Sequence, residues 1–363
     1  MERRSALSGG IRPPQRRRPP SEFSSPKFHP KHWRWMLSPS DKFRSIVLRY
    51  VPCLARDTAT SSDGPTMSTD QNHHYLPQSY QRGWADASGR PHVYRWHHDR
   101  LLCDLKATRA TGGEKGLYYV PMAPPEMRNV MEDVFWRQVD QWGADGLSVM
   151  RQATEDIEHR LNKPKLATFI TSFLYRNPAK IDYFEALARE HFLTRCSPEG
   201  YAAYRRPHEP ATFEGFLAGL DQPGMSEMGA AMLRSAVQNP PIRTHLLSMD
   251  WQIVTVTDGE PILTSDVPLI VFKGLADAEA LLILPLSSTE FFVAFNRGPI
   301  DMKARIQRAI EDGAFVEAMN RYVVQHKIAF VYACDDSQKD FVSRHWAISS
   351  AQAAQTDGLG RRR

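Results

Sequence analysis

The chain has 363 residues, of which 42% are hydrophobic and 24% are charged, with a formal net charge of +5. These values exclude a fully disordered or collagen-like chain and allow one large domain or two smaller ones. The positive excess is confined to residues 1–66, which carry 13 Lys and Arg against 5 Asp and Glu. Residues 67–363 carry 33 against 36, a net charge of −3, so the folded part has no global attraction for phosphates.

Residues 1–66 are rich in Arg, Pro and Ser and contain few periodic apolar positions. Such a segment buries too little apolar surface to offset its chain entropy, so we expect a disordered basic leader. No uninterrupted apolar run follows its basic start, which argues against a secretory signal. Three interpretations stay open: a nucleic-acid-binding arm, an organelle transit peptide, or a start codon assigned too early, with the true start at Met67.

The cysteines and the most apolar segment bear on the compartment. The four cysteines lie far apart and form no Cys-x-x-Cys pair, which fits neither a zinc ribbon nor a dense disulfide framework. We therefore expect reduced thiols in a cytoplasmic protein. The most apolar stretch, residues 281–295, is too short and too interrupted by polar residues to span a bilayer, so no membrane association is expected.

The first predicted elements are short and extended. Residues 72–76 are expected to form an extended segment at the start of the domain, because Pro77 disfavours a helical conformation at Leu76. A short helix or turn follows over 81–85. The alternating pattern of residues 91–97 predicts a strand with His92, Tyr94 and Trp96 on one face, and residues 117–120 predict another short strand.

The middle of the chain has helical periodicity. Met131, Phe135, Val139 and Trp142 share one helical face. The apolar residues of 166–174 recur at i, i+3, i+4, i+7 and i+8 and predict a second helix, which Asn177-Pro178 ends or kinks. A further helix begins near residue 181. Residues 210–248 are expected to be helical, with a break at 222–224.

The pattern returns to strands after residue 250. Residues 251–256 alternate and lead into a hairpin-type turn at 257–259, after which a strand resumes at 261–264. Phe315, Met319, Tyr322 and Val323 predict a last helix. The remaining strands are predicted at 269–272, 281–284, 291–295 and 328–333.

Strands therefore lie at both ends of the sequence, with helices between them. This order predicts an α+β fold in which a central helical layer packs on a mixed or antiparallel sheet built from N- and C-terminal strands. We expect a single domain over residues 67–350 and a flexible tail over 351–363. The common nucleotide-binding, zincin and α/β-hydrolase motifs are absent from the sequence.

Four motifs, in order, carry a resemblance to a known family. They are His74-Tyr75-Leu76-Pro77-Gln78, Tyr175-Arg176-Asn177-Pro178, Leu263-Thr264-Ser265-Asp266-Val267-Pro268 and Leu284-Pro285-Leu286-Ser287, followed by Met319-Asn320. With them, residues from about 72 to 335 resemble the bacterial domain-of-unknown-function family 4238. The family usually has Thr where this chain has Asn177. The resemblance implies a domain boundary and candidate positions, but no established activity.

Five of the thirteen histidines, at positions 73, 74, 92, 97 and 98, fall within 26 residues. Neutral imidazole is a common metal ligand, so His73 and His74 are candidate ligands for a divalent metal. The opening also faintly resembles that of His-Asn-His nucleases, but the Asn and second His of a following short helix are missing. The alternative is that His74 packs and hydrogen-bonds locally while His97 and His98 are solvated at a strand end.

Three further residues have a chemical and a structural interpretation each. Asp266, at a strand end, can act as a base or ligand, or form an Asx-turn before Pro268. Arg176 can clamp an anion, or pair with Glu132, Asp133 or Asp266. Asn320 can bind a polar ligand, or satisfy backbone groups near the last strand.

One combined hypothesis joins these residues: His74, Gln78, Arg176, Asp266 and Asn320 converge on a polar cleft between the helices and the sheet. The first functional interpretation is a hydrolase, with or without a metal, in which His74 and Asp266 are catalytic. Gln78, Arg176 and Asn320 then bind a substrate, with nucleic acid one candidate. The second is a non-enzymatic binding module in which the same residues form a structural hydrogen-bond network. The oligomeric state stays open.

Overall fold

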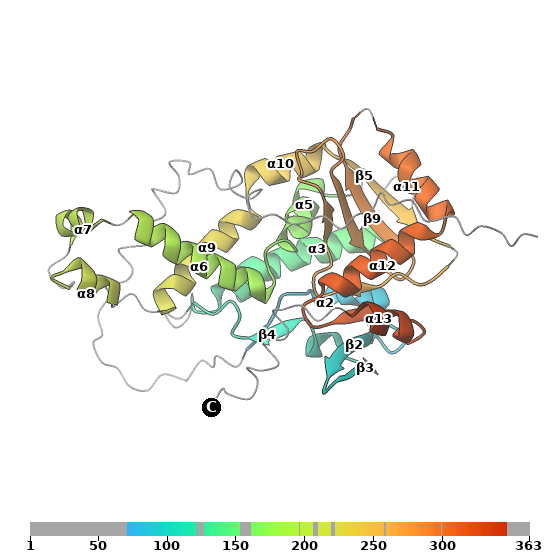
Figure 1. Cartoon of the computed structure of the whole chain (residues 1–363), viewed down its shortest axis with the longest axis horizontal. Coiled ribbons are helices and arrows are strands. Elements are labelled where there is room, and N and C mark those ends of the chain that lie inside the picture. Colours follow the sequence, from blue (N-terminus) through green and yellow to red (C-terminus); the bar gives the residue numbers. More distant parts are fainter. Residues whose placement is uncertain are drawn as a thin grey trace, which may run out of the picture. The chain divides into compact units, whose positions relative to one another are not determined.

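The structure is a computed structural model that describes most of the chain between residues 71 and 346 (Figure 1). The predictions for residues 1–66 and 351–363 fall outside these residues. The described ranges are 71–120, 123, 127–152, 161–195, 197–205, 210–218, 222–257, 259–298 and 300–346.

The first four-stranded sheet joins distant parts of the sequence. Its strands run in the order β3 (Arg100–Leu105), β2 (His92–His97), β10 (Val331–Ala333) and β6 (Thr264–Ser265). Every neighbouring pair is antiparallel. N- and C-terminal strands therefore share a sheet, as predicted. Both Val93 and Tyr94 are fully buried, so β2, a predicted strand, is covered on both faces near its middle.

The second four-stranded sheet comes from the C-terminal part of the chain. It runs β5 (Asp250–Thr255), β9 (Glu290–Phe295), β8 (Leu281–Pro285) and β7 (Ile270–Phe272), again antiparallel. The predicted hairpin after β5 is wrong, because β5 pairs with β9. Strands β8 and β9 are almost continuously apolar, which suits central strands that are buried on both faces.

A two-stranded ribbon carries the start of the family motif. Strand β1 (Asn72–His74) pairs with β4 (Gly113–Lys115), with His73 opposite Glu114. The predicted strand at 117–120 is wrong, because this segment is a turn after β4. Tyr118 and Val120 of that segment are buried without being in a strand. Short helices α2 (Gln78–Gln81) and η3 (Arg82–Trp84) follow β1, where a helix or turn was expected.

The helical layer is built on α3 (Arg137–Met150) and α5 (Lys163–Ser172), which pack closely together. A Cβ atom added at Gly143 would lie 2.2 Å from the Phe169 ring, so glycine permits this close approach. The turn η6 (Met131–Trp136) before α3 is π-helical. Helix α5 ends at Ser172, ahead of Asn177-Pro178, and Pro178 begins the next helix instead.

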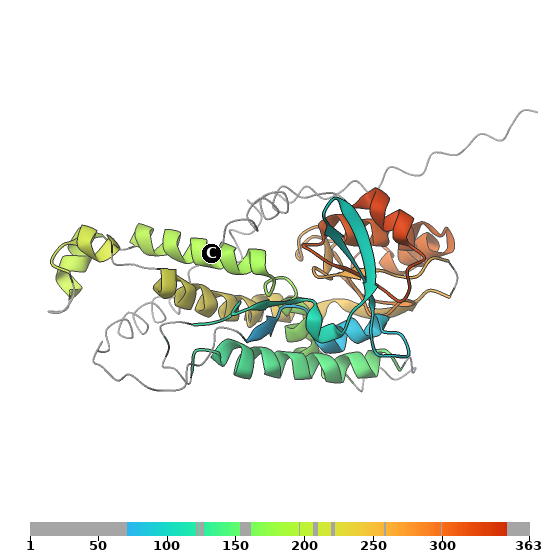
Figure 2. The same cartoon turned by 90° about the horizontal axis from the view of Figure 1, so that it is seen from below.

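The other helices of the middle segment follow from residue 178. Helices α6 (Pro178–Arg195) and α9 (Gln222–Val237) lie side by side in both views (Figures 1 and 2). Between them along the chain come α7 (Pro198–Tyr204) and α8 (Phe213–Ala218). The predicted break at 222–224 lies at the start of α9, and a further break before α10 (Pro240–Ser248) was not predicted.

The main core lies where both four-stranded sheets meet the C-terminal helices α11 (Met302–Glu311), α12 (Ala314–His326) and α13 (Lys339–His345). Fully burying one Val, Leu, Ile, Phe or Met side chain stabilises the fold by about 1.5–3 kcal/mol, before the loss of conformational entropy is counted. The fold class is α+β, as predicted, but with two four-stranded sheets and a ribbon. Among the described residues, no helix is long and apolar enough to cross a membrane. Residues Tyr94, Leu101, Ile283, Val293, Phe315, Met319, Val323, Val342 and Trp346 belong to this core.

Candidate functional site

The two histidines of β1 have different surroundings. His73 is fully buried, its Nδ1 accepts the backbone N–H of Tyr118 at 2.9 Å, and its ring stacks on the Tyr118 ring. His74 is half-buried, and its Nε2 lies 3.4 Å from the carbonyl oxygen of Arg109. Burial lowers the pKa of both imidazoles, which keeps them neutral at neutral pH. His74 therefore packs and bonds locally, as the structural alternative predicted.

Arg176 lies at the centre of the polar contacts around β1. Its Nη1 donates to Asp140 Oδ1 at 2.6 Å, and its Nη2 donates to Asp140 Oδ2 at 3.2 Å. The same Nη2 donates to the carbonyl oxygen of His74 at 2.7 Å, and the guanidinium lies 4.7 Å from the centre of the Trp136 ring. The Tyr118 hydroxyl donates to the Arg176 carbonyl. Arg176 thus joins β1 to η6 and α3, and it is only 1% exposed.

The ion-pair partner of Arg176 is Asp140, and not Glu132, Asp133 or Asp266 as the sequence suggested. Burial works against the charge of Arg176. The Asp140 carboxylate more than offsets this effect and holds the pKa of Arg176 above its ordinary value. Because the pair is bidentate and its Arg176 side is buried, it fixes the turn between α5 and α6 relative to α3.

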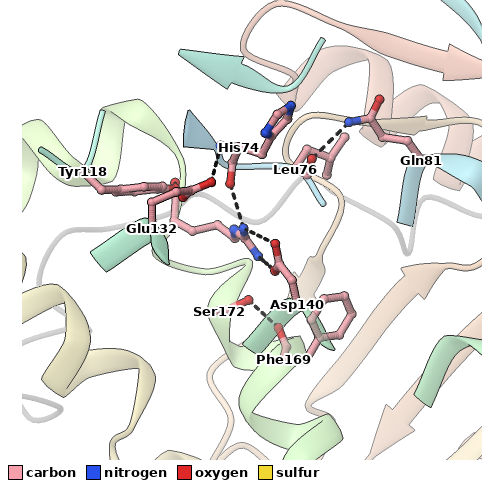
Figure 3. Close-up of polar contacts among 9 residues, drawn as sticks. His74, Leu76, Gln81, Tyr118, Glu132, Asp140, Phe169 and Ser172 are labelled. Carbon is pink, nitrogen blue, oxygen red and sulfur yellow. Dashed lines mark hydrogen bonds and ion pairs between the residues drawn. The ribbon is translucent and has the colours of Figure 1, made fainter. Parts of the chain in front are cut away.

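Glu132 faces the same guanidinium from the π-helical turn η6. Its Oε1 accepts the backbone N–H of His74 at 3.3 Å (Figure 3). Burial raises the pKa of Glu132 to about 7, although the charge of Arg176 and the N–H of His74 act in the opposite direction. The carboxylates of Asp140 and Asp133 raise this pKa further. π-helical turns occur frequently at functional sites.

We call His74, Tyr118, Glu132, Asp140 and Arg176 the Arg176 cluster. Two of its polar atoms, Glu132 Oε2 and Arg176 Nε, are buried and have no hydrogen-bond partner in the described structure. Trp136 Nε1, next to the cluster, is also buried and has no hydrogen-bond partner in the described structure. Buried polar atoms are nearly always bonded, so exceptions call for an explanation in function or strain. A carboxyl group that titrates near neutrality can transfer a proton, which is the chemistry this cluster offers.

Asp266 lies in a different network, which we call the Asp266 clamp. Its Oδ1 accepts the backbone N–H of Ile328 at 2.8 Å. Its Oδ2 accepts those of Ala329 at 2.6 Å and Phe330 at 2.9 Å. Asp266 is 2% exposed, and burial raises its pKa to about 6 against these three bonds and the charge of Lys327. The predicted Asx-turn is wrong, because the partners lie in the segment before β10.

Asn320 and Gln78 also bond to nearby groups. Asn320, on α12, accepts the N–H of Leu263 at 2.8 Å through Oδ1 and donates to the carbonyl of Pro261 at 2.9 Å through Nδ2. It therefore satisfies backbone groups, as its structural alternative predicted, although these groups precede β6. Gln78 accepts the hydroxyl of Thr108 at 3.2 Å.

The family motif after β1 contributes two aromatic anchors. The Tyr80 hydroxyl donates to the carbonyl of Pro285 at 2.7 Å and lies 2.8 Å from Thr264 Oγ1. Trp84 Nε1 donates to the carbonyl of Ile262 at 2.7 Å. Both side chains are fully buried, so this motif ties α2 and η3 to both four-stranded sheets.

The five residues of the predicted cleft fall into separate networks. His74 and Arg176 are in direct contact, whereas no hydrogen bond or ion pair of the described residues joins Asp266 or Asn320 to the Arg176 cluster. Burial and then the charge of Asp266 raise the pKa of Tyr75, the residue after His74. The sequence named Glu132 only as an ion-pair partner and did not name Tyr118.

Metal ligation has no geometric support in the described ranges. They contain no group of three or more His, Cys, Asp or Glu side chains that could hold a metal ion. His73 accepts an N–H bond on Nδ1, so its neutral ring carries the proton on Nε2 and has no free lone pair. Cys103 and Cys334 are free thiols.

The fold and the networks define an α+β domain held together by buried polar side chains from its motifs. The chain belongs to the family described as protein of unknown function (DUF4238), whose model matches residues 72–337. The match spans the Arg176 cluster, the Asp266 clamp and both four-stranded sheets. Comparisons with curated proteins and with solved structures find no match.

Proposed function

We propose that the protein is a non-enzymatic binding module in which the motif residues form a structural network. The Asp266 clamp is the observation that carries the proposal. A general base needs a lone pair directed at its substrate. Both oxygens of Asp266 instead accept backbone N–H groups, within 2.9 Å, and the side chain is 2% exposed.

The other motif residues support the same proposal. Arg176 forms an ion pair with Asp140. The amide oxygen and the amide nitrogen of Asn320 both form hydrogen bonds with backbone groups. Buried polar side chains that are bonded like those of Asp266 and Asn320 specify one arrangement of the chain. A hydrolase that used His74 and Asp266 together would have to break the contact of His74 Nε2 with the Arg109 carbonyl and the bonds from Asp266 to the segment before β10.

The test is the stability of Asp266→Asn. An amide nitrogen cannot accept the N–H groups on Oδ2, so we expect a loss of about 3 kcal/mol in the free energy of unfolding. Urea denaturation followed by circular dichroism measures it, with Asp312→Asn, an exposed residue, as the matched control. Unchanged stability of Asp266→Asn would contradict a structural role.

A second candidate function is acid–base catalysis by Glu132. One observation favours it: the Glu132 carboxyl group has a pKa of about 7, and its Oε2 accepts no hydrogen bond in the described structure. The test is hydrolysis of chromogenic esters, phosphodiesters and peptides by the protein and by Glu132→Gln. Activity that Glu132→Gln abolishes while keeping its fold supports this candidate. Absence of activity, or activity unchanged in the variant, refutes it.

We also propose a cytoplasmic location. The support is that Cys103 and Cys334 are free thiols, as expected of a reducing compartment. Subcellular fractionation with an antibody to the chain tests it, and recovery in an oxidising compartment would refute it.

A further inference from the structure

Strand β3 forms one edge of the first four-stranded sheet (Figure 1). The turn before it exposes His97 and His98, which confirms the expected solvation of these two histidines. The strand pairs with β2 over six consecutive residues, without a bulge or a proline. Natural proteins usually shorten, bend or interrupt an edge strand, because an open edge pairs readily with another chain. This edge has none of those features.

The backbone groups of β3 alternate between β2 and the open side of the sheet. The N–H of Lys106 donates to the carbonyl of Pro91 at 3.1 Å, which fixes the phase of the ladder. In an antiparallel ladder, hydrogen-bonded pairs alternate with pairs whose N–H and C=O groups point outward. Leu101, Cys103 and Leu105 therefore direct their N–H and C=O groups away from β2. None of the described strands pairs with that side.

Two opposite charges lie on one face of β3, because side chains alternate along a strand and Arg100, Leu102 and Asp104 are two residues apart. Arg100 is exposed and forms no ion pair in the described structure. Asp104 lies 3.6 Å from Arg95 and 3.5 Å from Lys106, in both cases through Oδ2, and its side chain is 44% exposed. The Oδ1 atom of Asp104 is thus left to accept a further donor.

We propose that β3 pairs antiparallel with β3 of a second copy of this chain, which joins two sheets across a two-fold axis. Such an axis makes the contact self-complementary, so each pairing occurs twice. With Leu102 opposite Leu102 of the second copy, Arg100 lies opposite Asp104 of the second copy, and Asp104 lies opposite its Arg100. Leu101 and Cys103, whose backbone groups point outward, then exchange hydrogen bonds across the contact.

The neighbouring registers lack this match of charges. A register with Cys103 opposite itself places Arg100 against Lys106, which has the same charge, and Leu102 against Asp104. The next register in the other direction places Arg100 against Leu102. Opposite charges directly across from each other stabilise a pair of strands, and like charges destabilise it. Charge and the outward backbone groups therefore select the same register.

The other edge strands of the two four-stranded sheets do not offer the same match. Strands β6 and β7 have only two and three residues. Strand β5 has one charged residue, Asp250, so a second copy of β5 brings it no positive partner. An extended peptide of another protein can also add to an open edge. The charges of Arg100 and Asp104, however, require a strand with opposite charges at the matching positions, which a second copy of β3 supplies.

The experiment exchanges charges between two variants of the full chain and measures mass by sedimentation velocity over a concentration series. The natural chain should approach the mass of two chains as its concentration rises. Arg100→Asp and Asp104→Arg should each weaken self-association by about 10-fold, because both attractive pairs become repulsive. An equimolar mixture of the two variants should recover the mass of two chains, since every charge again faces its opposite.

Two exposed residues at the end of α11 provide the matched controls. Arg308→Asp and Asp312→Arg should each self-associate as the natural chain does. Residues 1–66 are the same in every variant, so they cannot account for a difference between variants. Circular dichroism checks that each variant is folded.

If Asp104→Arg does not fold, because it loses its contacts with Arg95 and Lys106, Leu102→Glu takes its place. It sets two carboxylates against each other at the two-fold axis and should also give single chains. A natural chain that sediments as a single chain at every concentration overturns the proposal and leaves the edge to a peptide of another protein. Undiminished self-association of Arg100→Asp and Leu102→Glu, or a mixture of folded charge variants that stays as single chains, also overturns it.

Discussion

Replacing Glu132 by glutamine should change how stability depends on pH. The carboxyl of Glu132 has an ordinary pKa of 4.5, and in the folded protein its pKa is about 7. Each pKa unit corresponds to about 1.4 kcal/mol, so ionising this group in the folded state costs about 3 kcal/mol. The cost arises because burial removes water, and the positive charge of Arg176 only partly replaces it.

The sign follows from the raised folded-state pKa. Between pH 4.5 and about 7 the unfolded chain has lost the proton that the folded chain keeps, so stability falls as pH rises through this window. Glutamine cannot ionise, yet its carbonyl oxygen can still accept the N–H of His74. Glu132→Gln should therefore lack this decline and, above pH 7, be more stable than the natural chain by up to about 3 kcal/mol.

Urea denaturation at intervals from pH 4.5 to 8.5 measures the effect. Asp266, with a pKa of about 6, adds a decline of the same sign at lower pH, so the informative quantity is the difference between variant and natural chain. Glu311→Gln, at an exposed position, controls for the removal of a carboxylate. Parallel pH profiles for the natural chain and Glu132→Gln would refute the reasoning.

Three further substitutions test the packing and the networks by the same denaturation. Asn320→Ala leaves the buried N–H of Leu263 unpaired, while Gln338 still donates to the Pro261 carbonyl, so it should cost about 1–2 kcal/mol; a cost near zero would mean that water replaces the amide. Gly143→Ala should be destabilising by about 1 kcal/mol or more, because its Cβ would meet the Phe169 ring at 2.2 Å, and a gain in stability would show that the ring moves freely. Arg176→Met should cost about 1.5–3 kcal/mol, since it removes the charged hydrogen bonds to Asp140, whose carboxylate is half-buried. Adding Asp140→Asn to Arg176→Met should recover part of that loss, and strictly additive losses would contradict the pairing.

The helices at 131–150 and 163–172 were predictable because their large apolar residues recur at helical spacing and are buried. The periodicities at 131–142 and 166–174 correspond to η6 with α3 and to α5. Helices α11 and α13 were missed. Each is short, and each buries only one or two side chains, so its apolar pattern is too weak to read from one sequence.

The strand pairings were less predictable, because they depend on partners far along the chain. The alternation at 251–256 correctly indicated β5, but nothing local indicates that its partner is β9 rather than the next segment. The apolar residues of 117–120 were mistaken for a strand. Tyr118 is buried because its ring packs on Trp136, a tertiary contact that a turn can also provide.

The sequence identified several residues of the candidate site, but it did not identify most of the contacts that they make. Arg176 and His74 were named from their motifs and do lie in contact. Asp140 was not named as a partner, because any acidic residue of the polar helix face could have reached the guanidinium. Asp266 and Asn320 were named as polar residues in an apolar context, and the structure directs both towards backbone groups.

The joining of β2 to β10 has a consequence for synthesis on the ribosome. Tyr94 and its partner Val331 are about 240 residues apart in the sequence. At a synthesis rate of roughly 10 residues per second, Tyr94 is made about half a minute before Val331. During that time the nascent hairpin has an open, apolar edge, which is prone to pair with other chains. A stalled or truncated product that lacks the last strand keeps this edge exposed. We therefore expect the emerging chain to depend on a chaperone until Val331 leaves the exit tunnel.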